Sequence, residues 1–261
     1  MIIKNFDSLS ILTSELFLEY GISHLFTTTK DDSLNKRVDY TFKNNDYTDI
    51  LKNYEKIADF FKVPVSDIVK STQIHEDNIL KITPYHRGMG IVRETEIKNA
   101  DGIYTDFKNI PLCIFSADCI PVLIADKSKK AVFAVHSGWR GTAKDIAGKA
   151  VDILKNEYSV KSEDIICAIG PAISSCCFEV SEDVILALAG VYKNDDCYLK
   201  KDNGKYQLDL KKTVASLLEK KGVPSDNIDV CPLCTKCEDK LFHSYRREGE
   251  NAGRNAAFIM L

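Results

Sequence analysis

IPLCIFSADCIPVLIADKSKKAVFAVH, residues 110–136, contains two long apolar runs separated by a short polar turn. Runs of this kind, bounded by turn residues, predict strands that are buried on both faces. Pro121 lies inside the first run, so we expect a break or bulge after Ala117-Asp118-Cys119. The turn at 127–130 is short enough to return the second run, 131–136, beside the first. The stretch therefore predicts a buried β-hairpin.

Helical and strand patterns surround this hairpin on both sides. Apolar residues at helical spacing predict helices at 46–61, 142–158, 181–188 (with Ser181 as its cap) and 210–220. Short apolar runs predict strands at 165–169, 228–231 and 256–261, and Asp202-Asn203-Gly204 predicts a turn between two more. The polar stretch 28–47 predicts a long surface loop. Strands and helices interleave without a regular βαβ period, so we expect one mixed α/β domain that spans residues 1–261.

Length, charge and hydropathy exclude several classes of protein. The chain has 261 residues, of which 44% are hydrophobic and 28% charged, so it can bury a core without disulfides. Lys and Arg number 35 against 38 for Asp and Glu, which argues against a binder of nucleic acid or of a membrane surface. No apolar stretch reaches the ~18 residues of a membrane span. The N-terminal segment lacks the features of a signal peptide, so we expect a cytoplasmic protein.

Cysteine is abundant in this chain. The nine cysteines, an odd number, stand at positions 113, 119, 167, 176, 177, 197, 231, 234 and 237. Without a secretion signal, a disulfide framework is not expected. We therefore expect reduced thiols, some of which are candidates for metal binding or nucleophilic chemistry.

One cysteine and two histidines lie at expected strand ends. Cys119 follows the expected break, His136 ends the second strand of the hairpin, and His75 ends a strand further upstream. Cys119 and His136 can face each other across the hairpin, and His75 would complete a set of three. Three such ligands with an open fourth position are typical of a catalytic zinc site. No compact motif links the three residues, so spacing alone also leaves each of them a structural role.

A second cysteine cluster, CPLCTKC at 231–237, has the local pattern of a metal knuckle. A structural zinc ion needs four ligands, and no second Cys-x-x-Cys occurs elsewhere in the chain, which leaves His243 as the candidate fourth ligand. The alternative is that Cys231, Cys234 and Cys237 are reduced thiols around a turn. We interpret the vicinal pair Cys176-Cys177 as packing residues.

Arginines that suit an anion occur in two places. Arg140 follows the hairpin, and Arg246 and Arg254 lie near the C-terminus. The guanidinium fork matches the geometry of phosphate. The alternative is that these arginines pair with carboxylates such as Glu248 and Glu250.

Short motifs along the chain occur together, in this order, in a known bacterial family. They are Gln73-Ile74-His75, Ala100-Asp101-Gly102, Ala117-Asp118-Cys119-Ile120-Pro121-Val122-Leu123, His136-Ser137-Gly138-Trp139-Arg140-Gly141-Thr142, Ile169-Gly170-Pro171, Cys176-Cys177-Phe178-Glu179-Val180, Cys234-Thr235, Ser244-Tyr245-Arg246-Arg247 and Gly253-Arg254. From about residue 20 to 261 the chain resembles the laccase-domain family, long described as multicopper polyphenol oxidase. Members of that family are regarded as zinc-containing purine nucleoside phosphorylases that also deaminate adenosine.

The resemblance implies a fold, a cofactor and substrates. The implied fold is a single α/β (α+β) domain of mixed β-sheets flanked by helices, related to cysteine-dependent toxin deamidases. Zinc would be held by His75, Cys119 and His136, with no second metal site around Cys234 and Cys237. The implied substrates are inorganic phosphate and adenosine, inosine, guanosine and methylthioadenosine, with zinc-dependent adenosine deaminase activity besides. We expect a monomer or weak homodimer that binds neither nucleic acid nor membrane.

The resemblance also suggests roles for further residues. Arg140 and Arg246 are expected to hold phosphate, and Glu179 to contact the base or the ribose. Asp118 is expected either to orient a neighbouring ligand or to carry a proton. An arginine that the family carries near the N-terminus is missing here, and Lys30 is the candidate substitute, as a point charge without the guanidinium fork.

Other functions compete with this interpretation. In a metal-free cysteine hydrolase or deamidase, Cys119 would be the nucleophile and His136 the base. Bound metal distinguishes the two, because a zinc-bound thiolate is not free to attack an acyl group. A non-catalytic nucleoside-binding protein would use the same cleft. Copper-dependent phenol oxidation is rejected, because five histidines are too few for the several centres of a multicopper oxidase.

Overall fold

Two six-stranded sheets and one three-stranded sheet form the β-structure of the computed structural model, which describes residues 1–33, 37–43, 45–192 and 195–261. In spatial order, the first sheet contains β1 (Ile2–Phe6), β2 (Leu9–Thr13), β3 (Ser23–Asp31), β15 (Asn255–Met260), β7 (Leu112–Ser116) and β4 (Val69–Lys70). The second contains β14 (Ile228–Val230), β10 (Ile165–Ile169), β8 (Ile120–Asp126), β9 (Val132–Ser137), β6 (Gly102–Thr105) and β5 (Ile79–Lys81). The small sheet contains β11 (Glu179–Val180), β13 (Tyr206–Leu208) and β12 (Tyr198–Lys200).

The three longest described helices begin at aspartates that cap them. The helices are α1 (Glu15–Glu19), α2 (Tyr47–Phe61), α3 (Trp139–Ala143), α4 (Ile146–Tyr158), α5 (Glu182–Ala189), α6 (Leu210–Lys220) and α7 (Tyr245–Glu248). Asp46, Asp145 and Asp209 each accept a hydrogen bond from a backbone N–H in the first turn of α2, α4 and α6. These caps satisfy N–H groups that have no partner within the helix.

The expected break in the first apolar run carries the chain from one sheet to the other. β7 ends at Ser116 in the first sheet, and β8 begins at Ile120 in the second. Asp118 turns the chain between them with a left-handed φ of 87°. Pro121 lies inside β8, opposite His136, near the start of the strand, where a missing N–H is tolerated. The predicted break and the predicted β8–β9 hairpin are both confirmed.

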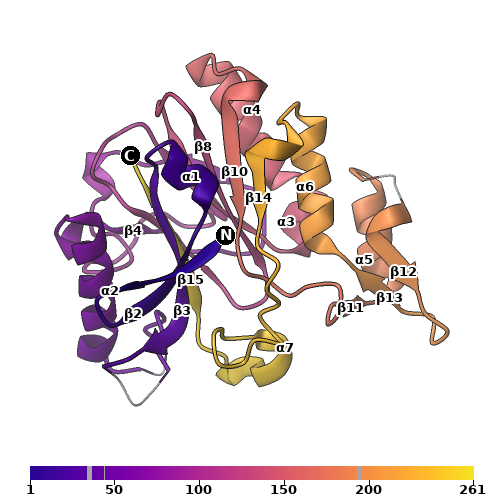
Figure 1. The fold of residues 1–261 in the computed structure, drawn as a ribbon, viewed down its shortest axis with the longest axis horizontal. Helices are drawn as coiled ribbons and strands as arrows, with labels where there is room; N and C mark the ends of the chain where they lie inside the picture. The colour runs from indigo at the N-terminus through magenta and orange to yellow at the C-terminus, as the bar shows by residue number, and fades with distance from the viewer. Residues whose placement is uncertain (34–36, 44, 193–194) are drawn as a thin grey trace.

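Alternation along the strands produces four layers. In β8, Leu123 and Ala125 face the core between the two large sheets, whereas Val122 and Ile124 face the helices on the other side. Helix α2 covers the outer face of the first sheet, and α4 and α6 cover that of the second (Figure 1). The central strands are therefore buried on both faces, as their apolar runs predict. The architecture is an α+β domain of mixed sheets with flanking helices, as expected.

Three expectations about local structure need correction or limits. The helix expected at 142–158 is divided, because Asp145 adopts a left-handed φ of 56° and caps α4 separately from α3. The loop expected at 28–47 begins later, because β3 continues to Asp31; residues 34–36 and 44 lie outside the described part. Ser181 occupies the cap position of α5, but its hydroxyl makes no capping bond there.

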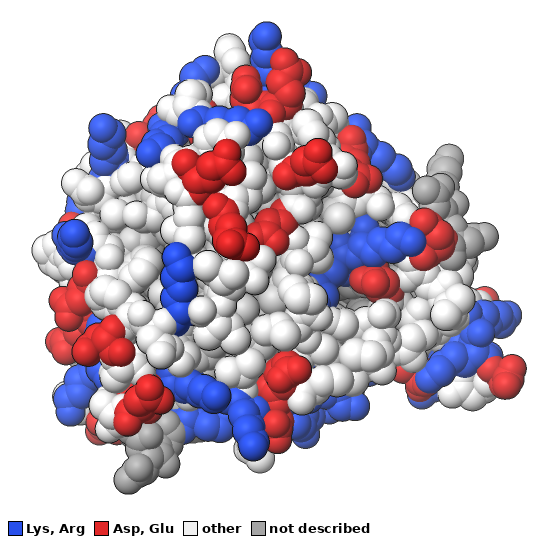
Figure 2. Space-filling model, viewed as in Figure 1, with Lys and Arg blue, Asp and Glu red and all other residues white. Residues whose placement is uncertain are grey.

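Acidic and basic side chains are interspersed over the face drawn in Figure 2. Within the described ranges, every helix is too short or too polar to cross a bilayer.

Candidate functional site

Three potential metal ligands meet beside the break between β7 and β8. His75 comes from the loop after β4, Cys119 from the break itself, and His136 from β9. Their donor atoms all lie within 4.8 Å of one another. The rings of His75 and His136 meet edge to face, with centroids 4.9 Å apart. The structure thus brings together the three residues that the sequence analysis selected.

A buried carboxylate, Asp101, organises both histidines. Its Oδ1 accepts hydrogen bonds from the backbone N–H of His75 (2.9 Å) and from Nδ1 of His136 (2.8 Å). Its Oδ2 accepts from the backbone N–H groups of Ile74 (3.0 Å) and Glu76 (2.9 Å). With Nδ1 of His136 held in this way, Nε2 is the nitrogen left to face the site. A carboxylate behind a ligand histidine is a common support of metal sites.

The charges in this cluster favour an ionised thiol. Burial opposes ionisation of Cys119, but the positive charge of His136 and hydrogen bonds from both histidines lower the pKa of the thiol to about 6. Burial also opposes protonation of His136, but the Cys119 thiolate and Asp101 raise the pKa of the imidazole. The same hydrogen bonds outweigh burial at Asp101 and lower its pKa. The cluster therefore stabilises a thiolate beside an imidazole.

This donor set fits a borderline-soft metal ion. One thiolate and two imidazoles are the ligands that zinc takes in catalytic sites, with a fourth position open. Gly138 has no side chain to crowd the cluster. A Cβ at this position would lie 3.1 Å from Cys119 Sγ and 3.4 Å from His75 Cδ2. The ligand types, the supporting carboxylate and the missing side chain all agree with a metal centre.

A cavity of about 880 Å³ contains all three residues in its wall. This volume is in the range of small-molecule sites, roughly 300–1,000 Å³. Aromatic side chains in the wall are Phe115, Trp139, Phe178 and Tyr245, and cationic ones are Lys43, Lys70, Arg246 and Arg254. The cavity therefore offers flat apolar surfaces and positive charge next to the ligand cluster.

Asp118 is placed at the cavity, but its carboxylate is occupied. Oδ1 accepts from Thr235 Oγ1 (2.6 Å), and Oδ2 accepts from Ser244 Oγ (3.0 Å) and the backbone N–H of Arg246 (2.6 Å). These bonds tie the break between β7 and β8 to the segment that leads into α7. Of the two roles expected for Asp118, the contacts favour positioning over proton transfer.

Arg246 and Arg140 occupy different environments. Arg246 lines the cavity, and its Nη1 donates to the backbone oxygens of Cys177 (3.3 Å) and Glu179 (3.1 Å). Arg140 is exposed and lies over the ring of Trp139, 4.2 Å from the centroid. It is not among the described residues that line the cavity. The expectation that Arg140 points into the cleft is therefore not met, because stacking on Trp139 holds its guanidinium outside.

Two other candidates also lie away from the cavity. The carboxylate of Glu179 pairs with Lys201 (2.7 Å) and Lys205 (3.3 Å) in the small sheet, and hydrogen bonds from these lysines lower its pKa to about 2. Glu179 borders a smaller neighbouring pocket that shares Trp139, Phe178 and Arg246 with the main one. Lys30 is exposed at the end of β3 and is not among the residues lining the described cavity.

Sequence reasoning missed several residues of the site. Asp101 lies in the Ala100-Asp101-Gly102 motif, which marks a position but says nothing of its partners. Lys43 and Lys70 lie in segments without a motif. Gln73 precedes His75 in its motif, and its amide bonds both backbone groups of Phe115, at 2.9 and 2.8 Å, which extends the edge of β7. Only the folded chain reveals these contacts.

The remaining histidines are engaged elsewhere. His24 bonds to backbone atoms of Ser14 and Ile22, His86 to Thr83, and His243 to Val38. Two histidines therefore remain for the cluster, which suits one metal ion and not the several centres of a multicopper oxidase.

Comparison with known proteins gives consistent results. The family model described as "Multi-copper polyphenol oxidoreductase laccase" matches residues 24–261. The sequence is similar to purine nucleoside phosphorylase YlmD of Bacillus subtilis (strain 168), with 37% identity over 214 residues, which are 81% of this chain and 77% of the relative. It is also similar to purine nucleoside phosphorylase CA_C1699 of Clostridium acetobutylicum, with 34% identity over 90% of this chain and 91% of the relative.

Solved structures share the fold. The crystal structure of YlmD from Geobacillus stearothermophilus has a TM-score of 0.91 and 31% identity, and the match covers 98% of this chain and 97% of that one. The crystal structure of the Bacillus licheniformis hypothetical protein YfiH also has a TM-score of 0.91, with 33% identity over 99% and 98% of the two chains. The likeness therefore extends over nearly the whole length of each chain.

Proposed function

Because this chain belongs to the multi-copper polyphenol oxidoreductase laccase family, we propose that it shares the activity in its relatives' names and is a purine nucleoside phosphorylase. Such an enzyme transfers the ribosyl group of a purine nucleoside from the base to inorganic phosphate. The observation that carries the proposal is that the His75, Cys119 and His136 cluster shares one cavity with aromatic and cationic side chains. Aromatic surfaces suit the purine base, and cationic side chains suit phosphate.

The aromatic side chains suit the purine. Trp139 and Phe178 both line the main cavity and its smaller neighbour, so they stand where the two join. Flat rings favour stacking against a purine face. We propose adenosine, inosine, guanosine and methylthioadenosine as the nucleosides that bind here, because stacking on flat rings is available to every purine.

The cations suit phosphate. Nη1 of Arg246 donates to two backbone oxygens, so the guanidinium is oriented before an anion binds, and Asp118 holds the backbone of the same residue by accepting from its N–H. Arg254 and Lys70 add charge in the same wall. An oriented guanidinium binds phosphate and stabilises the negative charge that develops as the base leaves. We assign Arg246 the main phosphate contact and Arg140 the task of supporting Trp139.

We further propose zinc as the ion of the cluster, with adenosine deamination as a second activity. When bound, zinc makes water nucleophilic near neutral pH, which is the chemistry that deamination requires. The chain itself contributes the thiolate of Cys119, the two imidazoles, and Asp101, which fixes the orientation of His136. Asp118 holds the cavity wall through Thr235, Ser244 and Arg246.

One observation favours a second candidate function. Cys119, His136 and Asp101 form a thiol, imidazole and carboxylate relay of the kind that cysteine hydrolases use, and the pKa of Cys119 is lowered. A metal-free protein would present Cys119 as a nucleophile. Metal content separates the two functions, because the same thiolate cannot serve both.

Product analysis tests the proposal. Purified protein is incubated with inosine or adenosine, with and without phosphate, and bases and ribose 1-phosphate are separated by chromatography. We expect base and ribose 1-phosphate in equal amounts, only with phosphate, and no turnover in Cys119→Ala. Deamination should appear as inosine from adenosine without phosphate. Base release at the same rate with and without phosphate would contradict phosphorolysis. Activity confined to acyl substrates would support the cysteine hydrolase.

A further inference from the structure

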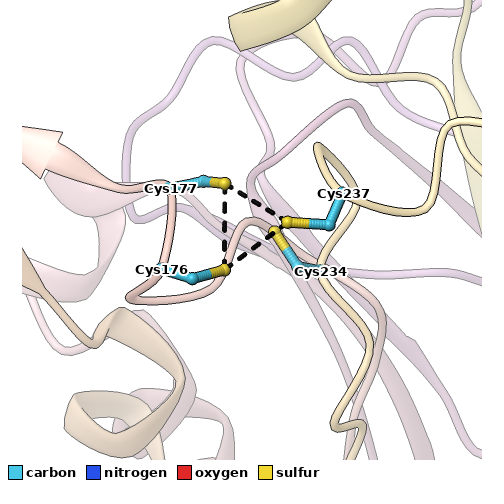
Figure 3. A group of neighbouring side chains, drawn as sticks. All are labelled: Cys176, Cys177, Cys234 and Cys237. Carbon is cyan, nitrogen blue, oxygen red and sulfur yellow. Dashed lines mark hydrogen bonds between the residues drawn. The ribbon is translucent and has the colours of Figure 1, made fainter.

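Four cysteines from two distant segments converge outside the cavity. Cys176 and Cys177 lie in the turn before β11, and Cys234 and Cys237 lie in the segment after β14 (Figure 3). Their sulfur atoms point toward one another and all lie within 4.8 Å. The Sγ atoms of Cys176 and Cys177 are 3.8 Å apart, those of Cys176 and Cys237 3.7 Å, and those of Cys177 and Cys237 3.4 Å.

The three distances among Cys176, Cys177 and Cys237 are close to those of one face of a tetrahedron around a metal ion, and the Cys234 sulfur lies within 4.8 Å of all three. Zinc lies about 2.3 Å from each thiolate sulfur, so the sulfurs of a regular tetrahedral site are about 3.8 Å apart. Four thiols gathered without a cation would crowd negative charge as soon as two of them ionised. A divalent ion removes this repulsion and uses all four sulfurs at once.

The backbone around Cys234 has the form of a metal knuckle. Cys234 and Cys237 are three residues apart, the Cys-x-x-Cys spacing of such a knuckle. The N–H of Ser174, in the other segment, donates to the Cys234 sulfur at 3.4 Å. Donors of this kind orient thiolate ligands and spread their charge.

We propose that Cys176, Cys177, Cys234 and Cys237 bind a structural zinc ion, separate from the ion of the His75, Cys119 and His136 cluster. Four sulfur ligands close the coordination sphere, which is typical of structural zinc. The expectation that Cys231, Cys234 and Cys237 bind no metal rested on the lack of a convincing fourth ligand and on the single metal site that the family resemblance implies. Cys176 and Cys177 supply them, whereas His243 bonds to Val38 and Cys231 is not among the four.

A buried cation lies beside the segment that carries Cys234. Nζ of Lys211 donates to the backbone oxygens of Cys231 (2.8 Å) and Leu233 (3.0 Å). A zinc ion with four thiolates carries a net charge of about −2. Lys211 offsets part of that charge.

The ion would fasten the wall that presents Arg246. Arg246 bonds to the backbone oxygen of Cys177, and Arg247 bonds to that of Lys236 at 2.8 Å. Thr235, between Cys234 and Lys236, bonds to Asp118 at 2.6 Å. A zinc ion joining the two segments would therefore hold the backbone to which these side chains are attached.

Metal content of purified variants tests the proposal. We expect two zinc ions per chain in the unsubstituted protein, one in Cys119→Ala and one in Cys237→Ser. Cys231→Ala is the matched control, because it removes a thiol from the same segment but not from the group, and it should retain two. A single zinc per chain that disappears in Cys119→Ala, or two zinc ions retained in Cys237→Ser, would overturn the proposal. Iron in place of zinc would overturn the choice of metal.

Alkylation of the unsubstituted protein gives a test that does not depend on a variant that folds. Cys176 and Cys237 are exposed, so without a metal they should react readily with iodoacetamide. With zinc bound, we expect both to resist modification, as read by mass spectrometry of peptides, until a chelator removes the ion. Equal alkylation rates with and without the chelator would refute the site. X-ray absorption of Cys119→Ala should then find four sulfur ligands near ~2.3 Å and no nitrogen.

Discussion

Replacing Asp101 by asparagine tests whether one carboxylate organises both histidines. Asp101 is fully buried and accepts four hydrogen bonds, two on each oxygen. An asparagine has one acceptor oxygen, so it can keep one pair of donors and must turn its NH₂ group toward the other pair. Two hydrogen bonds to a charged group are lost, each worth about 1.5–3 kcal/mol. We therefore expect Asp101→Asn to lower the free energy of unfolding by roughly 3–6 kcal/mol.

The same change should weaken metal binding. Removal of a carboxylate behind a ligand histidine usually costs about 10–100-fold in metal affinity. Zinc affinity is measured by competition with a chromophoric chelator, and stability by urea unfolding of the metal-free protein. Asp126→Asn is the matched control, because Asp126 is also fully buried and accepts backbone N–H groups, at 3.1, 2.7 and 3.2 Å, but lies at the far end of β8, where the turn to β9 begins. It should lose stability without losing zinc affinity.

Together, Asp101→Asn and Asp126→Asn distinguish a role of Asp101 in stability from a role in positioning the metal ligands. If Asp101→Asn and Asp126→Asn lose stability alike and both bind zinc as the unsubstituted protein does, Asp101 is only a structural acceptor. The proposed role of Asp101 at the metal site would then be refuted.

Three further outcomes follow from particular contacts. Arg246→Ala should lower kcat/KM for phosphorolysis more than tenfold, above about 1.4 kcal/mol, with little effect on deamination, whereas Arg140→Ala should cost less than threefold in both; equal losses in the two variants would contradict the phosphate assignment. Cys119→Ala should remove the metal of the cluster and abolish both activities, and retained deamination would contradict the ligand set. Burial lowers the pKa of His24 to about 4, so between pH 6.5 and 4 the histidine is protonated in the unfolded chain but neutral in the folded one. The free energy of unfolding should therefore fall by about 3 kcal/mol as the pH decreases from 6.5 to 4. Urea unfolding of His24→Gln should show a flatter pH dependence, and an unchanged one would contradict the assignment.

The sequence predicts the parts of the fold that depend on local patterns. The apolar runs at 110–136 predict the hairpin and its break, because burial on both faces leaves no polar position in a strand. Helix α2 follows from apolar spacing and the cap at Asp46. The division between α3 and α4 is not predictable in the same way, because Asp145 looks like any helical surface residue until its left-handed conformation is known.

The site likewise has parts that the sequence predicts and parts that depend on the folded chain. His75, Cys119 and His136 could be selected because few residue types bind metal and each was expected at a strand end, although His75 in fact lies in the loop after β4. Arg140 is placed differently from the expectation, because the sequence gives its distance along the chain from His136 but not the stacking on Trp139. The convergence of Cys176 and Cys177 with Cys234 and Cys237 depends on the approach of two segments about sixty residues apart, near the Ala172–Cys234 bridge.

The central claim is that one zinc ion and one nucleoside share the cavity beside His75, Cys119 and His136. The most direct test is a crystal structure of the protein with zinc and a non-cleavable inosine analogue, with anomalous diffraction measured at the zinc edge. We predict an anomalous peak about 2.3 Å from Cys119 Sγ and about 2.0–2.1 Å from a nitrogen of each histidine, with the purine between Trp139 and Phe178. An analogue bound elsewhere, or no zinc among these three residues, would contradict the account.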